Sequence, residues 1–493
     1  MNRFRISILL ISAAALLAGC DGAPDSRAGF RPPRNWRELS LPVRTDFAPM
    51  PCEKHTLPNG IVVFLAEDHE LPLVSVKIAF RGGSVHEPAG KTGLADILTE
   101  TLRSGGTGTL PAERFDEALE DIAANLAIGV ELDRTTVSFS VLKEDVGRGF
   151  ELLTDLLRNP ALPPEKMKLA LDRARSKIAR RNDNTGEIAS REFRKLLYGA
   201  DSPWAATSEY ASLDRITRED LADFHRLVFQ PRGMIVGAWG DFNAADMKKR
   251  IEAAFESWKG DGRELPAVAR PVATTPMSVH LARKENVNQT QIMLGRFLEL
   301  RRNSPDYAAV ILVNEILSGS FGSRLFNEVR TKRGLAYTVG GAIIAPYEDR
   351  PAVFRAACQT RSDATVEAIG VIRDEIRKLK TAGATADELR QARDSVLNTF
   401  VFEAATKDDI VSRRMHYEFY GYPPDFANRV FTRIATLSLA EVNAAAARYL
   451  DGDNVVILAV GDDKAFGKPL SALGDVRDVD IIIPSPAPPQ TGP

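Results

Sequence analysis

One helix-then-strand pattern occurs twice in the chain at a constant spacing, and this repeat limits the possible folds more than any other feature. The first copy, residues 216–241, reads ITREDLADFHRLVFQPRGMIVGAWGD, and the second, residues 437–462, reads LSLAEVNAAAARYLDGDNVVILAVGD. Corresponding residues such as Leu221 and Val442 lie 221 positions apart throughout (442 − 221 = 221). We therefore predict that the chain is a duplication of one structural unit.

The two halves share a longer plan around this pattern. A weaker similarity relates residues 97–102 (ILTETL) to residues 312–317 (LVNEIL), at a spacing of 215. Each half begins with alternating strand patterns, such as residues 61–65 and 73–80, continues with amphipathic helices and returns to a strand. This order predicts an α+β fold of two duplicated mixed α/β halves, with helices packed on one face of each sheet.

The length and local composition place the boundaries. A chain of 493 residues is too long for one ordinary core. Residues 259–276 are rich in Pro, Gly and charge and have no helical period, which is typical of a linker. We therefore expect an N-terminal domain at 46–258 and a C-terminal domain at 277–483. The tail, residues 484–493, contains five prolines and is predicted to be disordered.

The overall composition excludes several classes of protein. Lys and Arg total 64 and Asp and Glu total 66, so no strong field attracts nucleic acid. Hydrophobic residues make up 44% of the chain, which excludes a disordered or collagen-like protein. Because Cys20, Cys52 and Cys358 form no Cys-x-x-Cys pattern, a zinc site built on sulfur is also excluded.

The N-terminus has the layout of a secretory signal. Two arginines precede an apolar run over residues 6–18, which is too short to span a bilayer comfortably. The run ends in Leu-Ala-Gly before Cys20, an order that resembles the bacterial lipobox, in which the cysteine is lipidated after cleavage. We expect a signal peptide at 1–19 and a lipidated tether at 20–45. The alternative is a plain secretory signal with a chance cysteine.

These signals predict a protein of the bacterial periplasm, lipid-anchored to the inner or the outer membrane. The leaflet is not determined by the residue that follows Cys20. In that oxidising compartment Cys52 and Cys358 could form a disulfide, or they could stay as two separate thiols.

Two segments carry a family resemblance that covers nearly all of the predicted mature chain. These segments are Leu57–Leu102 and Leu317–Val339. Both resemble the pitrilysin/insulinase family of zinc metallopeptidases, which includes the mitochondrial processing peptidase. In the first segment the matching residues include Gly83, Ser84, Glu87 and the Gly-Leu-Ala before Asp96. The resemblance implies the mitochondrial-processing-peptidase/LuxS-like metallohydrolase fold, with the two halves forming a clamshell.

The zinc motif of that family is degenerate here. Active members carry His-x-x-Glu-His on the first helix, where two imidazoles hold zinc and the glutamate takes a proton from zinc-bound water. The matching residues are Asp96, Thr99 and Glu100, and the third ligand falls on Ser176 or Lys177. We therefore expect no metal and no cofactor in this chain.

Two further interpretations of these polar helices stay open at the sequence level. Asp96 and Glu100 could hold a hard cation weakly, or Glu100 could form an ordinary ion pair with Arg103 at i, i+3. The basic stretch Lys166–Arg181 indicates a solvated helix face or, as an alternative, a groove for an acidic substrate.

Other residues of the family's site have matches in this sequence. By resemblance, Arg330 and Tyr337 match the family's arginine and tyrosine that reach the substrate beside the zinc, Arg330 near the end of a helix over 322–333 and Tyr337 in the next strand. The hairpin Leu126–Leu142 matches the family's strand that pairs with an extended peptide.

The resemblance then implies a zinc-lacking subunit of a heterodimeric periplasmic metalloendopeptidase, which is inactive alone. Its partners would be a homologous subunit that holds zinc and an unstructured peptide substrate. The substrate-binding residues are unknown from the sequence. The alternative is a non-catalytic scaffold or peptide-binding homologue of the same fold.

Overall fold

The structure, a computed structural model, describes residues 52–271, 277–347, 350–400, 402 and 405–485, which belong to one compact unit. The predicted signal peptide, Cys20, the tether and the tail from residue 486 onward lie outside the described residues. In the described part of the chain, no helix is both long and apolar enough to cross a membrane.

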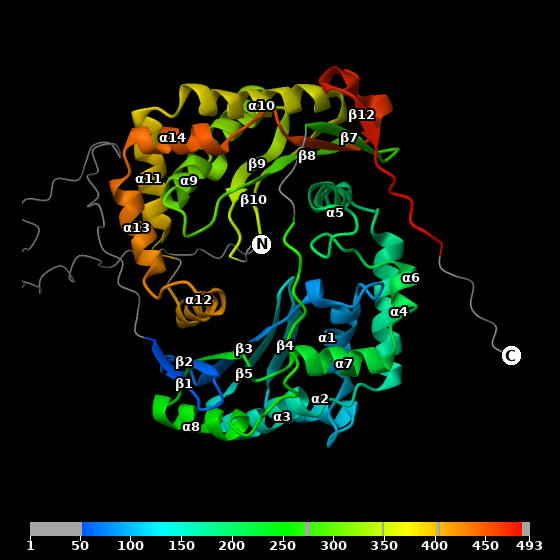
Figure 1. Ribbon diagram of the computed structural model, residues 1–493, viewed down its shortest axis with the longest axis vertical. Coiled ribbons are helices and arrows are strands. Elements are labelled where there is room, and N and C mark those ends of the chain that lie inside the picture. The colour runs from blue at the N-terminus through cyan, green and yellow to red at the C-terminus, as the bar shows by residue number, and fades with distance from the viewer. Residues whose placement is uncertain (1–51, 272–276, 348–349, 401, 403–404, 486–493) are drawn as a thin grey trace, which may run out of the picture. The chain divides into compact units, whose positions relative to one another are not determined.

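The first half of the chain contains one six-stranded mixed sheet and its helices (Figure 1). Its main elements are β1 (Glu53–Thr56), β2 (Val62–Glu67), β3 (Leu73–Arg81), α1 (Leu94–Gly105), α2 (Ala112–Asp121), β4 (Asn125–Val130), β5 (Arg134–Leu142), α3 (Val146–Arg158), α4 (Pro164–Arg180), α5 (Thr185–Tyr198), α6 (Tyr210–Leu213), α7 (Arg218–Val228), β6 (Ile235–Gly240) and α8 (Ala244–Phe255). The strand order is β1-β2-β6-β3-β5-β4, so β4 is an edge strand.

The second half contains the matching sheet. Its main elements are β7 (Ser278–Arg283), β8 (Gln289–Leu298), α9 (Tyr307–Asn314), the π-helical turns η4 (Glu315–Gly319) and η5 (Phe326–Lys332), β9 (Ala336–Ile344), β10 (Ala352–Arg361), α10 (Thr365–Ala382), α11 (Ala386–Phe400), α12 (Lys407–Tyr420), α13 (Phe426–Thr436), α14 (Leu439–Tyr449), β11 (Val456–Gly461) and β12 (Val476–Asp478). The strand order is β12-β7-β11-β8-β10-β9, so β9 takes the edge position that β4 has in the first half.

The predicted repeat is confirmed in the bounds of its elements. Helices α7 and α14 begin and end 221 residues apart (439 − 218 and 449 − 228), and so do β6 and β11 (456 − 235 and 461 − 240). Both helices start with a capping box, in which Thr217 pairs with Asp220 and Ser438 pairs with Glu441. Such a box satisfies backbone N–H groups that a helix start leaves without partners, which explains why the two copies begin in the same register.

Each sheet has one face covered by helices of its own half. The strands alternate, as in β5, where every second residue is buried. In the first half Phe80 and Leu98 are fully buried in this core, and in the second half Phe354 and Leu312 are. This is the predicted arrangement of helices on one sheet face.

The opposite face of each sheet receives a helix from the other half. Helix α5 packs on β8 and β11 of the second sheet, and α12 packs on β2 and β6 of the first (Figure 1). These two helices are themselves related by the repeat, since both of their ends are 222 residues apart (407 − 185 and 420 − 198). The two halves therefore exchange equivalent helices.

Apolar packing and charge hold α12 on the first sheet. Val411 and Met415 are buried against Phe64 and Ile235. A Cβ atom at Gly237 would stand 2.4 Å from the sulfur of Met415, so the glycine allows the helix to approach this closely.

The segment between the halves has no regular structure in the part that is described. Residues 259–271 contain no helix or strand, and the Trp204 indole N–H donates to the carbonyl of Ala269 at 2.9 Å.

Cys52 and Cys358 are both free, so the disulfide that the sequence left open is not formed. Burial raises the pKa of the Cys52 thiol to about 11 and that of Cys358 to about 12.

Candidate functional site

The candidate site is the exposed side of α1 and the surfaces around it. Helix α1 buries Leu94, Ile97, Leu98 and Leu102 against the sheet, as its apolar period predicts. The remaining face carries the three positions of the degenerate zinc motif.

The start of α1 is fixed by a buried carboxylate. The two oxygens of Glu87 accept hydrogen bonds from the backbone N–H groups of Gly93, at 3.0 Å, and Ala95, at 2.8 Å. Burial raises the pKa of Glu87 to about 7, although both hydrogen bonds oppose this rise. In the sequence, Glu87 stands out only as a match to the family, because its role depends on a contact eight residues along the chain.

At the motif positions the structure places cations. The Glu100 carboxylate lies 3.1 Å from Lys177 Nζ and 3.7 Å from an Arg173 guanidinium nitrogen, both on α4. The Thr99 hydroxyl donates to the carbonyl of Asp96 at 3.0 Å. Surrounding protein raises the pKa of the Asp96 carboxyl, while Lys177 acts in the opposite direction. Lys177, one of the two residues matched to the third ligand of the family, therefore places an ammonium group against the Glu100 carboxylate and neutralises it.

The predicted ion pair between Glu100 and Arg103 is wrong. Arg103 instead contacts Asp116 at 2.8 Å and donates to the carbonyl of Leu126 in the edge strand β4. A guanidinium reaches partners on neighbouring elements as easily as one on its own helix, so spacing alone does not decide the pair.

A zinc ion does not fit this set of side chains. Thr99 cannot accept a proton from a metal-bound water at neutral pH, and the Lys177 ammonium within 3.1 Å of Glu100 would repel a divalent cation. Among the described residues, no cluster of three or more His, Cys, Asp and Glu side chains could hold a metal ion. The interpretation in which Asp96 and Glu100 bind a hard cation is not supported by this geometry.

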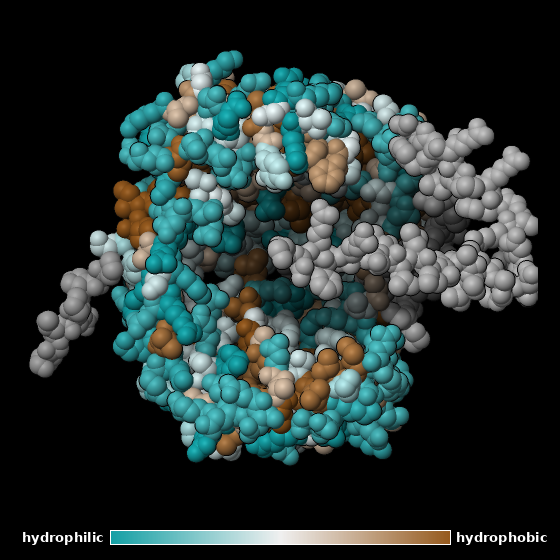
Figure 2. All heavy atoms as spheres, turned by 180° about the vertical axis from the view of Figure 1, so that it is seen from behind, coloured by the Kyte–Doolittle hydropathy of each residue, from teal (hydrophilic) through white to brown (hydrophobic). Residues whose placement is uncertain are grey.

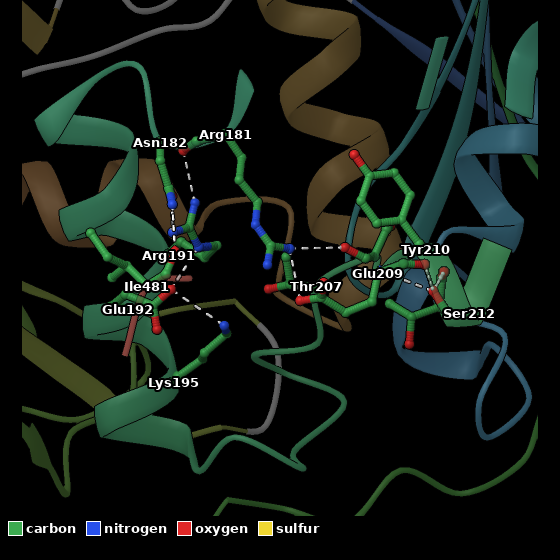
Figure 3. Close-up of polar contacts among 12 residues, drawn as sticks. Arg181, Asn182, Arg191, Glu192, Lys195, Thr207, Glu209, Tyr210, Ser212 and Ile481 are labelled. Carbon is green, nitrogen blue, oxygen red and sulfur yellow. Dashed lines mark hydrogen bonds and ion pairs between the residues drawn. The ribbon is translucent and has the colours of Figure 1, made fainter. Parts of the chain in front are cut away.

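The basic helix α4 is largely neutralised by acids. Besides the contacts to Glu100, Lys168 pairs with Asp172 at 2.7 Å and Arg175 with Asp214 at 2.8 Å. Just past the helix end, Arg181 pairs with Glu209 at 2.7 Å (Figure 3). The geometry favours the solvated face over a groove for an acidic substrate.

The hairpin predicted as a peptide-pairing edge is formed by β4 and β5, which are antiparallel. Strand β4 stands at the end of its sheet with one side unpaired by any described strand. The Arg103 side chain bonds to the carbonyl of Leu126 at 3.0 Å, so α1 and the edge strand are held together.

Arg330 and Tyr337 lie together in the second half. Arg330 is in the last turn of η5, Gly334 follows with a φ of 61°, and Tyr337 is the second residue of β9. The Arg330 guanidinium carbon lies 4.4 Å from the ring centre of Tyr337 and 4.6 Å from that of Phe326. Tyr337 is 78% exposed, so the guanidinium is held between two rings at the surface.

The structure brings together some of the predicted site residues and not others. Asp96, Thr99 and Glu100 lie on one turn of α1, and Arg330 contacts Tyr337. Within the described ranges, no hydrogen bond or ion pair joins the first group to the second.

The fold and the site define a duplicated, mixed α/β protein in which α1 carries Asp96, Thr99 and Glu100 and in which Glu100 pairs with cations of α4. The sequence profile described as insulinase, peptidase family M16, matches residues 62–199, and the profile described as peptidase M16 inactive domain matches residues 215–396. The chain belongs to this insulinase, or pitrilysin, family, which confirms the resemblance seen in its sequence.

The relatives of this chain include a protein that is named as a non-peptidase and proteins that are named as zinc proteases. It is 23% identical over 387 residues to a non-peptidase homolog, YmxG, of Helicobacter pylori, covering 78% of this chain and 88% of that protein. It is 22% identical over 409 residues to a Bacillus subtilis protein described as an uncharacterized zinc protease, also YmxG, covering 82% and 97%. A solved peptidase M16 inactive domain from Pseudomonas fluorescens aligns with a TM-score of 0.76 and 25% identity, covering 85% of this chain and all of that one. The predicted fold of two mixed α/β halves is confirmed.

Proposed function

We propose that this chain is the zinc-lacking subunit of a two-subunit peptidase, and that it supplies Arg330 and Tyr337 to a zinc site on a homologous partner. The substrate would be an unstructured peptide, which the complex degrades. The chain would lie in the bacterial periplasm, anchored to the inner or the outer membrane through a lipid on Cys20.

One observation carries the proposal: the metal position is neutralised while the arginine and tyrosine are kept available. Lys177 and Arg173 balance the Glu100 charge, so the first half has no unmet need for a metal. The Arg330 guanidinium, by contrast, is held between Phe326 and Tyr337 and forms no ion pair or hydrogen bond with any described residue. Its N–H donors are therefore available to a group outside this chain.

The chemistry of the pair suits a peptide bond under attack. A guanidinium and a phenol aimed at one point can donate hydrogen bonds to the oxygen of a scissile carbonyl as it gains negative charge. The exposed edge strand β4 supports the same substrate class, because an extended peptide can add to an unpaired strand.

The second candidate is a scaffold or peptide-binding protein without a catalytic role. It is favoured by the Helicobacter pylori relative, whose name describes a non-peptidase homolog. Under this alternative the pair of Arg330 and Tyr337 would have no effect on any turnover.

The test is peptidase activity on a quenched unstructured peptide, measured for this chain alone, for a zinc-bearing homologue alone and for their mixture. Only the mixture should reach full activity. Arg330→Ala should lower its turnover by roughly 100-fold, which is the usual cost of removing one donor to an oxyanion. Tyr337→Phe, which removes only the phenol oxygen, should lower turnover in the same direction.

Arg333→Ala is the matched control. Arg333 directly follows η5 and pairs with Glu367 at 3.7 Å, away from the Phe326 and Tyr337 rings that hold Arg330, so this variant should keep full turnover. Assembly is checked by size-exclusion chromatography. A mixture that assembles and works equally well with Arg330→Ala would refute the catalytic role and favour the scaffold.

A further inference from the structure

A groove runs between α5 and the face of the second sheet that this helix covers. It is formed by two adjoining cavities of about 300 Å³ and 530 Å³. Four residues line both cavities: Ser190 and Arg194 from α5, and Met293 and Arg355 from β8 and β10. The groove therefore has two ends that meet at a pair of arginines.

These two arginines come from opposite walls. Both side chains line the groove, and neither guanidinium forms a hydrogen bond or an ion pair with any residue that the structure describes. Burial by the surrounding protein lowers the pKa of Arg194, and the charge of Arg191 adds to the effect. Glu187 lines the larger cavity but pairs with neither guanidinium. Two positive charges that no described carboxylate neutralises favour an anionic ligand there.

Arg191, one turn earlier on the same helix, has a guanidinium whose nitrogens are hydrogen-bonded to neighbouring residues. It donates to Glu192 at 2.6 Å, to the carbonyl of Arg181 at 2.9 Å and to Asn182 at 2.8 Å (Figure 3). Asn182 in turn donates to the carbonyl of Ile481 at 2.5 Å. This network holds the Arg191 guanidinium, which also lines the larger cavity, whereas the Arg194 guanidinium has no such partners.

The smaller cavity is apolar beyond the arginines. Phe193, Leu197 and Val353 line it together with Met293. Phe193 and Met293 are buried in the apolar cluster that joins α5 to the sheet. An apolar group can therefore be accommodated directly beside the two guanidinium groups.

The larger cavity is polar. Asn184, Glu187 and Gln291 line it, along with Ser190. These side chains offer both donors and acceptors of hydrogen bonds, which is what a peptide backbone requires.

We propose that this groove binds the C-terminus of a peptide that ends in an apolar residue. The terminal carboxylate lies between Arg194 and Arg355, the last side chain enters the apolar cavity, and the preceding residues leave through the polar cavity. The C-terminal residue of a peptide carries its carboxylate and its side chain on the same Cα atom. This arrangement fits the groove, in which the two arginines lie directly beside the apolar cavity. A fatty acid would leave the polar end unused. The site belongs to this chain alone, so it goes beyond the proposed function and does not depend on a partner subunit.

The test is direct binding of a fluorescein-labelled hexapeptide, Gly-Ser-Gly-Ala-Ser-Phe, to the purified full chain by fluorescence anisotropy at about 0.15 M salt. The free acid should bind, and its C-terminal amide should bind roughly tenfold or more weakly, because it lacks the charged acceptor. An amidated peptide with aspartate at the penultimate position keeps the net charge and should also bind weakly.

Arg355→Gln and Arg194→Gln should each weaken binding of the free acid by roughly tenfold. Arg361→Gln is the matched control, since Arg361 lies on the same strand and contacts Asp363 at 3.1 Å; it should bind like the natural chain. Circular dichroism verifies that all variants are folded.

Equal binding of the acid and the amide, or unchanged binding in both groove variants, would overturn the proposal. So would the absence of any binding. Decanoate that displaces the peptide completely, and binds more tightly than it, would assign the groove to fatty acids instead.

Discussion

The buried carboxylate at the start of α1 should make the stability of the protein depend on pH in a direction opposite to that of most carboxylates. Glu87 is raised from an ordinary pKa of 4.5 to about 7 by burial. The unfolded chain releases this proton near pH 4.5, and the folded chain keeps it until about pH 7. The stabilisation is therefore fully present below pH 4.5 and is lost as the pH rises through 7.

The size of the effect follows from the two pKa values. A difference between 4.5 and about 7 corresponds to about 3 kcal/mol, because one pH unit is worth about 1.36 kcal/mol. Glu87→Gln should remove this dependence. A protonated glutamate and a glutamine each offer one good acceptor oxygen to Gly93 and Ala95, so the variant should match the natural chain near pH 5. At pH 8 it should be more stable by about 2–3 kcal/mol, since the two hydrogen bonds of the ionised carboxylate are already contained in its pKa.

Urea denaturation at pH 5 and pH 8, followed by circular dichroism, measures this difference. Glu117→Gln is the control, since Glu117 is an exposed carboxylate on α2 and its replacement should leave the pH dependence intact. If Glu87→Gln were less stable than the natural chain at pH 8, the carboxylate would have to be ionised without penalty. The account of α1 capping by a buried, partly protonated group would then be refuted.

Two other variants test the packing and the charge pairs. Gly237→Ala should cost about 1–3 kcal/mol in thermal or urea unfolding, since its Cβ atom would stand 2.4 Å from the sulfur of Met415; unchanged stability would show that α12 does not lie so close to the sheet. Glu388 accepts two hydrogen bonds from Arg324, which lower its pKa to about 2, so its stabilisation is present above pH 4.5 and is lost as the pH falls toward 2. Glu388→Gln should therefore lower the free energy of unfolding by about 1–2 kcal/mol at pH 7, allowing for partial exposure. It should also reduce the loss of stability between pH 4.5 and pH 2 in urea unfolding. A loss equal to that of the natural chain would contradict the pairing.

The repeat could be predicted from the sequence because its signals are local. The capping residues Thr217 and Ser438 and the helical periods that follow them sit within a few positions of each other, so α7 and α14 could be located in register. The placement of Arg330 at a helix end, before a left-handed Gly334, is local in the same way.

The contacts between distant elements could not be predicted in this way. The apolar face of α5 indicates burial, yet nothing in its period says that Phe193 packs on the sheet of the other half. Glu100 has a suitable partner at i+3 but pairs with Lys177, 77 residues away. Arg191 and Arg194 look alike in the sequence. Only the fold shows that the Arg191 guanidinium is hydrogen-bonded to its neighbours and that the Arg194 guanidinium is not.

One face of the molecule can be judged by the hydropathy of its side chains. Figure 2 shows a face that is mostly hydrophilic, with hydrophobic side chains gathered in separate small patches. Scattered apolar side chains of this kind are normal for a folded protein.

The reciprocal exchange of α5 and α12 gives the fused chain the architecture of a symmetric dimer. Each half covers the open sheet face of the other with an equivalent helix, as two identical subunits related by a twofold axis do across an isologous interface. An ancestor that encoded one half would have been complete only as a pair. Joining two copies in one chain makes that pairing intramolecular, so the two halves no longer have to carry the same side chains.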